Sequence, residues 1–316
     1  MRIQFASQFF HTSQTAPFGI LIKPVAPTLF LLGNTVNAWT LGGREFLRAA
    51  AGSFDAVYVV PGPAEYAANQ NECWRMNLRR LLDATTVYPN IHVLAQGTAK
   101  AGPVTLCGAT LWGPLIGYNA KTHPDTAWVR ERVLVDKADE TPDDEHNSHL
   151  LLQTIHDDAV RNLCRSDRNF FNEQLLSTYK PTGQYVFGSY HVPYYECLTS
   201  ADMKSRDVLG MMNDYRFIFR KPLRLWLCGA GVGGKNYYDA DTGVLFAKNA
   251  RGDGAEAAAG YSPEMFMDVG TTELDVVRRS ERALELVRDG AIPELRAEKV
   301  ERDLDQEFDP KIQPGH

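Results

Sequence analysis

The spacing of apolar and polar residues predicts a chain in which strands and helices follow one another. Residues 2–7 alternate apolar and polar side chains as a β-strand does, and the loop after them carries Gln8, Phe9, Phe10 and His11. In an α/β sheet, the loop after a strand's carboxyl end is the usual place for chemistry. Further strands are predicted at 28–32, 56–60, 91–94, 104–112, 185–189, 223–228, 244–248 and 265–269.

Helical spacing of apolar residues predicts helices at 41–51, 65–83, 150–163 and 170–179. Residues 18–23 are expected to form a short strand or edge segment. The run at 104–112 indicates either a strand pair or one strand with a bulge at Gly108. Strands and helices that alternate through about residue 269 indicate an α/β layered fold.

Two stretches depart from this alternation. Residues 114–149 form a polar insertion that is strongly acidic at 136–145, and we expect a long surface loop there. From residue 270 to 316 the chain is charged and helical in pattern, which predicts a C-terminal helical extension after a domain at 1–269. Both stretches are expected to provide contact surface for a protein partner.

Composition and charge narrow the range of partners. The 316 residues carry a net charge of -6, so no basic patch points to nucleic acid or to anionic lipid. The five cysteines form no C-x-x-C pair, which favours reduced thiols over a disulfide frame or a zinc site. No signal or transit peptide is recognisable and the apolar runs are too short for a bilayer. We therefore expect a cytoplasmic protein.

Short motifs at the predicted strand ends recur in an order that is informative as a series. They are MRIQFAS at the start, LFLLGN at 29–34, VYVVPGPAEY at 57–66, GATLWG at 108–113, SYHVP at 189–193, WLCGAG at 226–231, NARG at 249–252 and YSPEMFMDV at 261–269. Taken together, this series resembles the calcineurin-like metallophosphoesterase family over about residues 1–269. The resemblance implies a four-layer α/β/β/α sandwich and, in that family, phosphoester hydrolysis by two divalent metals.

The metal-ligand positions of that family are occupied by other residues in this chain. The positions that differ are Gln8, Phe10, Asn34, Pro63, Ala64, Ala230 and Val232. Only His191, before Val192-Pro193, still matches a ligand position. Amide and apolar side chains are poor substitutes for carboxylates and imidazoles, so the sequence predicts no dinuclear metal site and no cofactor. The leading hypothesis is a catalytically inactive protein, a pseudoenzyme that serves as a structural or binding component of a larger assembly.

Two alternatives stay open. The first is a phosphoesterase with a rebuilt metal or acid–base site, for which His11, Glu65, His191 and Asp239 are the polar candidates.

The second alternative is a nucleotide- or phosphate-binding loop at 229–235, with Gly229, Gly231, Gly234 and Lys235 as its residues. This loop matches a phosphate-binding motif except that Asn236 replaces the final Ser or Thr. The residues after it favour a turn and a strand over the helix that such a loop needs.

Aromatic side chains near His191 allow two interpretations. Tyr190, Tyr194 and Tyr195 either fill the space that metals and their ligands would occupy or anchor a partner at the mouth of a cleft.

Overall fold

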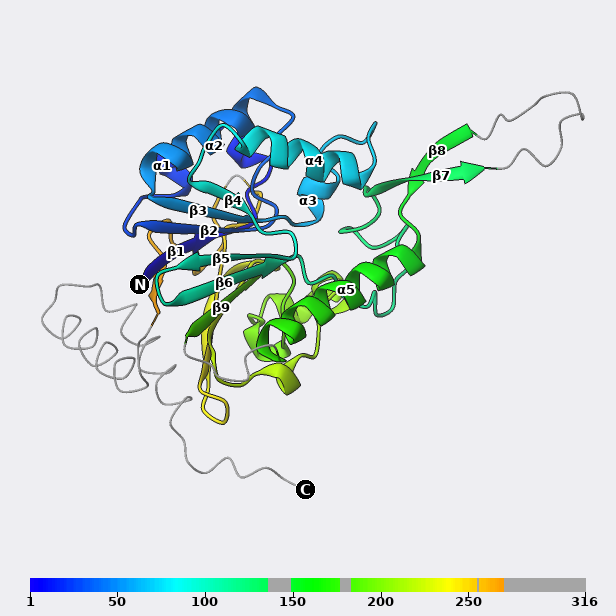
Figure 1. The fold of residues 1–316 in the computed structure, drawn as a ribbon. Helices are drawn as coiled ribbons and strands as arrows, with labels where there is room; N and C mark the ends of the chain where they lie inside the picture. Colours follow the sequence, from blue (N-terminus) through cyan, green and yellow to red (C-terminus); the bar gives the residue numbers. More distant parts are fainter. Residues whose placement is uncertain (136–148, 177–182, 255, 270–316) are drawn as a thin grey trace, which may run out of the picture. The chain divides into compact units, whose positions relative to one another are not determined.

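A computed structural model of the protein describes residues 1–135, 149–176, 183–254 and 256–269 (Figure 1). The chain divides into two units, Met1–Val269 and Gly270–His316, and all described residues belong to the first. The helical extension predicted at 270–316 therefore lies outside the described residues, as does the whole acidic stretch at 136–145. None of the described helices is both long and apolar enough to cross a membrane.

The first sheet has five strands in the order β13-β1-β2-β3-β4. Its strands are β1 (Arg2–Ala6), β2 (Thr28–Leu32), β3 (Ala56–Val60), β4 (Ile91–Val93) and β13 (Phe266–Asp268). β1 to β4 run parallel, and β13 pairs antiparallel with β1. The carboxyl ends of β1, β2 and β3 therefore meet at one edge of this sheet.

The second sheet has six strands in the order β11-β12-β10-β9-β6-β5. Its strands are β5 (Gly97–Ala101), β6 (Val104–Ala109), β9 (Gln184–Ser189), β10 (Leu223–Cys228), β11 (Gly233–Asp239) and β12 (Val244–Ala250). The four central strands are parallel, whereas β5 and β11 are antiparallel edges. Ser7, just after β1, forms a parallel bridge with Ala250 at the end of β12, which brings the carboxyl ends of β1 and β12 together.

Helices cover the outer faces of both sheets (Figure 1). Apolar side chains of α2 (Leu41–Ser53) and α4 (Trp74–Thr85) pack on the first sheet, and those of α5 (Asp157–Leu176) pack on the second. A separate core between the sheets joins Phe5 and Phe30 to Leu106, Val186 and Leu227. The expected four-layer α/β/β/α sandwich is thus confirmed.

The remaining helices are short. They are α1 (Phe18–Leu21), α3 (Pro63–Tyr66), α6 (Arg206–Gly210) and the 3-10 turns Thr12–Gln14, Tyr195–Cys197, Asp202–Lys204 and Arg216–Ile218.

Tertiary contacts change several predicted boundaries at the N-terminal end. The segment expected as a strand at 18–23 is the helix α1, because the ring of Phe18 packs against Phe46 of α2, with centroids 5.0 Å apart. The single helix expected at 65–83 is two, α3 and α4. The side-chain amide of Asn77 donates to the carbonyls of Tyr66 and Asn69 and so stabilises the loop between them.

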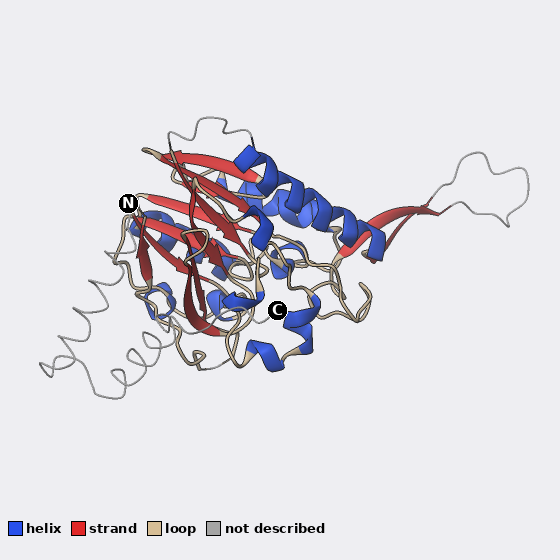
Figure 2. Cartoon of the chain, turned by 90° about the horizontal axis from the view of Figure 1, so that it is seen from below, coloured by secondary structure: helices blue, strands red, loops and turns tan. Residues whose placement is uncertain are grey.

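The middle of the chain differs more. Residues 150–154, expected as the start of a helix, belong to the strand β8 (His149–Thr154), which pairs with β7 (Arg130–Val135). The insertion predicted as a loop is therefore partly a two-stranded arm that extends away from the sandwich (Figures 1 and 2). Gly108 lies inside β6 without a bulge, and the antiparallel edges β5 and β11 have too few apolar residues for the pattern to predict them.

Candidate functional site

The loops after β1 and β2 lie side by side at the edge where the parallel strands end. Gln8 (φ 61°) and Asn34 (φ 51°) both adopt the left-handed backbone conformation, which is uncommon for residues other than glycine. The backbone N–H of Phe9 donates to the Asn34 carbonyl over 2.8 Å. Their two side chains are thereby directed into the same space.

Tyr190, just after β9, fills that space. Its hydroxyl oxygen accepts hydrogen bonds from Gln8 Nε2 and Asn34 Nδ2, each over 2.8 Å, and Asn34 Oδ1 accepts from the backbone N–H of Ala64 over 2.9 Å. Only 2% of Tyr190 is exposed, and its ring lies so close to Gly33 that a Cβ there would come within 2.5 Å of it. Of the two interpretations of the aromatic series, the space-filling one applies to Tyr190.

Glu65 does not face this space. Its carboxylate accepts hydrogen bonds from the backbone N–H groups of Asn34, Thr35, Val36 and Gly62, at 2.6 to 3.0 Å. Burial raises the pKa of Glu65, and the four N–H groups act in the opposite direction. Its role is therefore to hold the loop after β2 against the start of α3.

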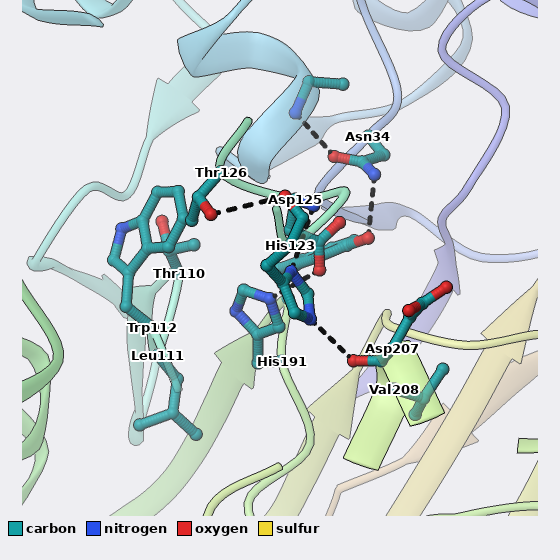
Figure 3. A network of polar contacts seen from close by, with 12 residues as sticks. Asn34, Thr110, Leu111, Trp112, His123, Asp125, Thr126, His191, Asp207 and Val208 are labelled. Carbon is teal, nitrogen blue, oxygen red and sulfur yellow. Dashed lines mark hydrogen bonds and ion pairs between the residues drawn. The ribbon is translucent and has the colours of Figure 1, made fainter. Parts of the chain in front are cut away.

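His191 forms a pair with an aspartate of the insertion. His191 Nε2 lies 3.1 Å from Asp125 Oδ2; the imidazole is 2% exposed and the Asp125 side chain 24%. The ring of Trp112 packs on His191 with centroids 5.7 Å apart (Figure 3). Asp125 was not predicted as a site residue, because its position in a polar insertion gave no sign that it returns to the strand ends.

Hydrogen bonding indicates which ring nitrogen of His191 carries the proton. His191 Nδ1 is buried and has no partner among the described residues, so a proton at Nδ1 would be left unpaired. The tautomer with its proton on Nε2 avoids this cost. In that tautomer His191 Nε2 donates and Asp125 Oδ2 accepts the hydrogen bond.

A second histidine links Asp125 to the segment across the cavity. His123 Nδ1 accepts from the backbone N–H of Asp125 over 3.1 Å, while Nε2 donates to the backbone carbonyl of Asp207 over 2.8 Å (Figure 3). His123 itself is fully buried. It fixes the segments of Asp125 and Asp207 relative to each other.

A cavity of about 210 Å³ lies at the carboxyl ends of the strands. The residues around it are Gln8, Pro124, Asp125, Tyr190, His191, Val192, Ala201, Asp202, Ser205, Asp207, Val208, Met211, Ala230, Gly231 and Val232. The cavity thus joins the Asp125–His191 pair to three of the predicted metal-ligand positions, Gln8, Ala230 and Val232.

The predicted phosphate-binding loop is already filled by a side chain of the protein. The Asp202 carboxylate accepts from the backbone N–H of Val232 over 2.8 Å and forms a fully buried ion pair with Lys248 of β12. A Cβ at Gly231 would lie 2.2 Å from this carboxylate. The loop continues into β11 and not into a helix, and Lys235 Nζ donates to the Leu198 carbonyl. The loop of Gly229, Gly231, Gly234 and Lys235 therefore surrounds a carboxylate of the protein itself and not a bound phosphate.

Two further polar candidates lie away from the cavity. His11 is exposed, and its backbone N–H donates to Asp253. Asp239 ends β11 opposite Val244, the first residue of β12, so it lies at the other edge of the sheet, where it pairs with Arg216. A site built from His11, Glu65, His191 and Asp239 together is therefore wrong; of these four, only His191 reaches the cavity.

The donor atoms do not fit a dinuclear metal centre. Gln8 and Asn34 offer amides that are bonded to Tyr190, the Glu65 oxygens are taken by backbone N–H groups, and Phe10, Pro63 and Ala64 offer no side-chain ligand. In the part of the chain that the structure describes, no group of three or more His, Cys, Asp or Glu side chains could hold a metal ion. We therefore derive no reaction step through a metal.

Comparison with known proteins identifies the fold. No protein-family model matches the chain, and no curated protein sequence matches it. The crystal structure of phosphopantetheinyl hydrolase from Mycobacterium tuberculosis is similar, with a TM-score of 0.54 and 14% sequence identity, over 79% of this chain and 90% of that chain. A dimetal phosphatase from Danio rerio aligns with a TM-score of 0.43 and 11% identity, over 84% and 91% of the two chains. The chain has the calcineurin-like metallophosphoesterase fold.

These comparisons correct one expectation. The prediction that the protein is not an enzyme is contradicted, because the solved structure that shares this fold is named as a hydrolase. The expectation of an inactive protein equated the loss of the metal ligands with the loss of catalytic activity. That inference overlooked Asp125, which no motif marked and which brings a carboxylate to His191.

Proposed function

We propose that the protein is a hydrolase of phosphodiester bonds that uses Asp125 and His191 as an acid–base pair. The observation that carries the proposal is the hydrogen bond between His191 Nε2 and Asp125 Oδ2 at a cavity beside the strand ends. This is the edge of an α/β sheet at which ligands usually bind. The proposal corresponds to the alternative of a phosphoesterase with a rebuilt acid–base site. Asp125 takes the place of His11, Glu65 and Asp239 as the partner of His191.

The chemistry follows from the exposure of the two side chains. Asp125 is the partly exposed member, so its carboxylate accepts a proton from a water molecule as the water oxygen forms a bond to phosphorus. The bond from phosphorus to the leaving oxygen breaks, and the Asp125 carboxylic acid returns the proton to that oxygen. His191 holds the carboxylate in position through Nε2–H. Proton transfer by a positioned side chain contributes roughly 10²- to 10⁴-fold to a rate.

The charge of the cavity supports a diester over a monoester. None of the described residues around the cavity is a lysine or an arginine. Lys248, which is not among the residues that border the cavity, neutralises Asp202. A phosphomonoester dianion would therefore meet carboxylates without a counter-charge. A diester carries one negative charge fewer and is repelled less.

Hydrolysis of bis(p-nitrophenyl) phosphate tests this proposal. We expect turnover that persists in EDTA and falls about 100-fold or more in Asp125→Asn, with a smaller loss in His191→Gln. Asp158→Asn removes the same charge from the surface of α5 and is the matched control. Absence of turnover in the wild type, an unchanged rate in Asp125→Asn, or a rate abolished by EDTA and restored by Mn²⁺ would each overturn the proposal.

We also propose a protein contact at the β7–β8 arm, with a second copy of this chain as the partner. Leu151 and Leu152 of β8 are 53% and 37% exposed, and neither edge of the arm is paired within the described residues. Exposed edge strands are commonly protected by charge, yet 150–154 carries none, whereas β7 contains Arg130, Glu131 and Arg132. An uncharged edge is complementary to itself in an antiparallel pair of copies.

The oligomeric state tests the arm. We expect light scattering after size exclusion to show a concentration-dependent dimer that Leu151→Lys dissociates. Val87→Lys, at a residue that is 71% exposed on another surface, should leave the dimer intact. A monomer at every concentration, or a dimer that is insensitive to Leu151→Lys, would contradict this contact.

A further inference from the structure

The negative charge in the cavity wall is not balanced by any lysine or arginine among the described residues that border the cavity. Asp125 and Asp207 both border it, and Asp207 keeps one carboxylate oxygen beyond the hydrogen bond that Oδ1 accepts from the Tyr118 hydroxyl over 2.6 Å. The third carboxylate, Asp202, is neutralised by Lys248. His123 bonds to the backbone of both Asp125 and Asp207, so the segments that carry these two carboxylates are fixed relative to each other (Figure 3).

The same negative charge acts on the floor of the cavity. Burial is the main cause that raises the pKa of Tyr190 well above its ordinary value, and the Asp125 carboxylate is the next cause in the same direction. Glu65 and Asp253 add to it, while the hydrogen bond from Gln8 opposes it.

The other walls are apolar and suit an organic group. Val192, Val208 and Met211 border the cavity together with Ala201 and Ala230. A divalent metal needs several oxygen or nitrogen ligands, and the described residues provide no such group. A cation that carries its own alkyl groups needs only a nearby negative charge and apolar contacts, because it is weakly hydrated.

We infer that the substrate of the proposed reaction carries an ammonium group, which binds in this cavity beside Asp207 while the phosphodiester lies at Asp125. The inference rests on the proposed function for the bond that is cleaved, and on the cavity alone for the cation. The ammonium group compensates the negative charge of the diester, which otherwise faces two carboxylates. The ligand class is therefore a zwitterionic phosphodiester, and an anionic phosphomonoester is excluded by charge.

Two isosteric substrates test the inference. The p-nitrophenyl diesters of 2-(trimethylammonio)ethyl phosphate and 3,3-dimethylbutyl phosphate have the same shape and differ by one positive charge. We expect kcat/KM about 5-fold higher for the charged substrate, with the difference mainly in KM, since an exposed ion pair contributes up to about that factor. Asp207→Asn should reduce the ratio of the two kcat/KM values to near unity, whereas Asp158→Asn should preserve it. Equal kcat/KM in the wild type would overturn the inference and leave the proposed hydrolysis standing.

Calorimetry separates binding from turnover. Tetramethylammonium chloride should bind the wild-type protein and bind about 5-fold more weakly to Asp207→Asn, with 3,3-dimethyl-1-butanol and sodium chloride as uncharged and ionic-strength controls. Binding of the ammonium ion without hydrolysis of either diester would reject the proposed function and retain the cation site. Absence of binding, or binding that Asp207→Asn does not weaken, would reject the cation site whatever the rate of hydrolysis.

Discussion

The hydroxyl oxygen of Tyr190 lies 2.8 Å from Asn34 Nδ2 and connects the end of β9 to the loop after β2. The same oxygen accepts from Gln8 Nε2 after β1. One phenol therefore joins three strand ends through neutral hydrogen bonds, at the place where the family resemblance would put charged ligands around metals. Gln8 and Asn34 both have left-handed backbone conformations. The shared Tyr190 hydroxyl holds their two loops together through hydrogen bonds to uncharged side chains.

Removal of that hydroxyl should destabilise the fold. In Tyr190→Phe the amide groups of Gln8 and Asn34 lose a shared acceptor in a buried site, which costs about 1–3 kcal/mol for each group left unpaired. We expect the free energy of unfolding in urea to fall by about 2–4 kcal/mol. Tyr195→Phe, at a residue that is 45% exposed, is the control and should change it little. A loss equal to that of the control would show that the phenol does not join the loops.

Glu65 should contribute to stability through its charge. Glu65→Gln keeps the shape of the side chain. Its amide N–H group would face backbone N–H groups whose hydrogen bonds the carboxylate accepts in the wild type. We expect a loss of about 3 kcal/mol in the free energy of unfolding, because buried donors lose a charged acceptor. Glu45→Gln on α2, whose side chain is 57% exposed, should be neutral. If both variants unfold at the wild-type urea concentration, Glu65 is not the support of the loop after β2.

The buried pair of Asp202 and Lys248 should show strong coupling. Lys248→Met leaves a buried carboxylate without its cation, and Asp202→Asn leaves a buried ammonium without its anion, each at a cost of about 3–5 kcal/mol. The double variant should lose less than the sum of the two single variants. A double-mutant cycle in urea measures this difference, and additive losses would contradict a direct interaction.

Asp167 should make stability depend on pH in an unusual direction. Burial raises its pKa from 3.8 to about 6, against hydrogen bonds from Gln96 and from the backbone of Trp112. Between these two values the folded state binds more protons than the unfolded state, so the contribution of Asp167 to stability falls as pH rises, and it levels off above about pH 6.

Asp167→Asn removes this titration. The free energy of unfolding of the wild type relative to Asp167→Asn should fall by on the order of 3 kcal/mol between pH 4 and pH 7. Urea titrations at intervals of one pH unit measure the change, and Asp158→Asn should run parallel to the wild type. A difference that is constant or that grows with pH would show that the carboxyl is not perturbed by burial.

Local patterns were sufficient for the central strands. Largely apolar runs at 28–32, 56–60 and 223–228 match β2, β3 and β10, because a strand that is buried on both faces needs apolar residues at most of its positions. The sequence pattern did not predict the edge strand β11 or the strand β8. Each of them is stabilised by hydrogen bonds to one neighbouring strand and not by burial of apolar side chains.

The sequence by itself determined the layered α/β fold and the identity of the residues that arrive at the strand ends, because both follow from the order of residues along each strand. It also located His191 beside that edge. Only the tertiary structure decided the partners: Tyr190 against Gln8 and Asn34, Asp202 in the glycine loop, and Asp125 against His191. Asp125 and His191 are 66 residues apart, and no local pattern encodes a contact made by an insertion that folds back over the sheet edge.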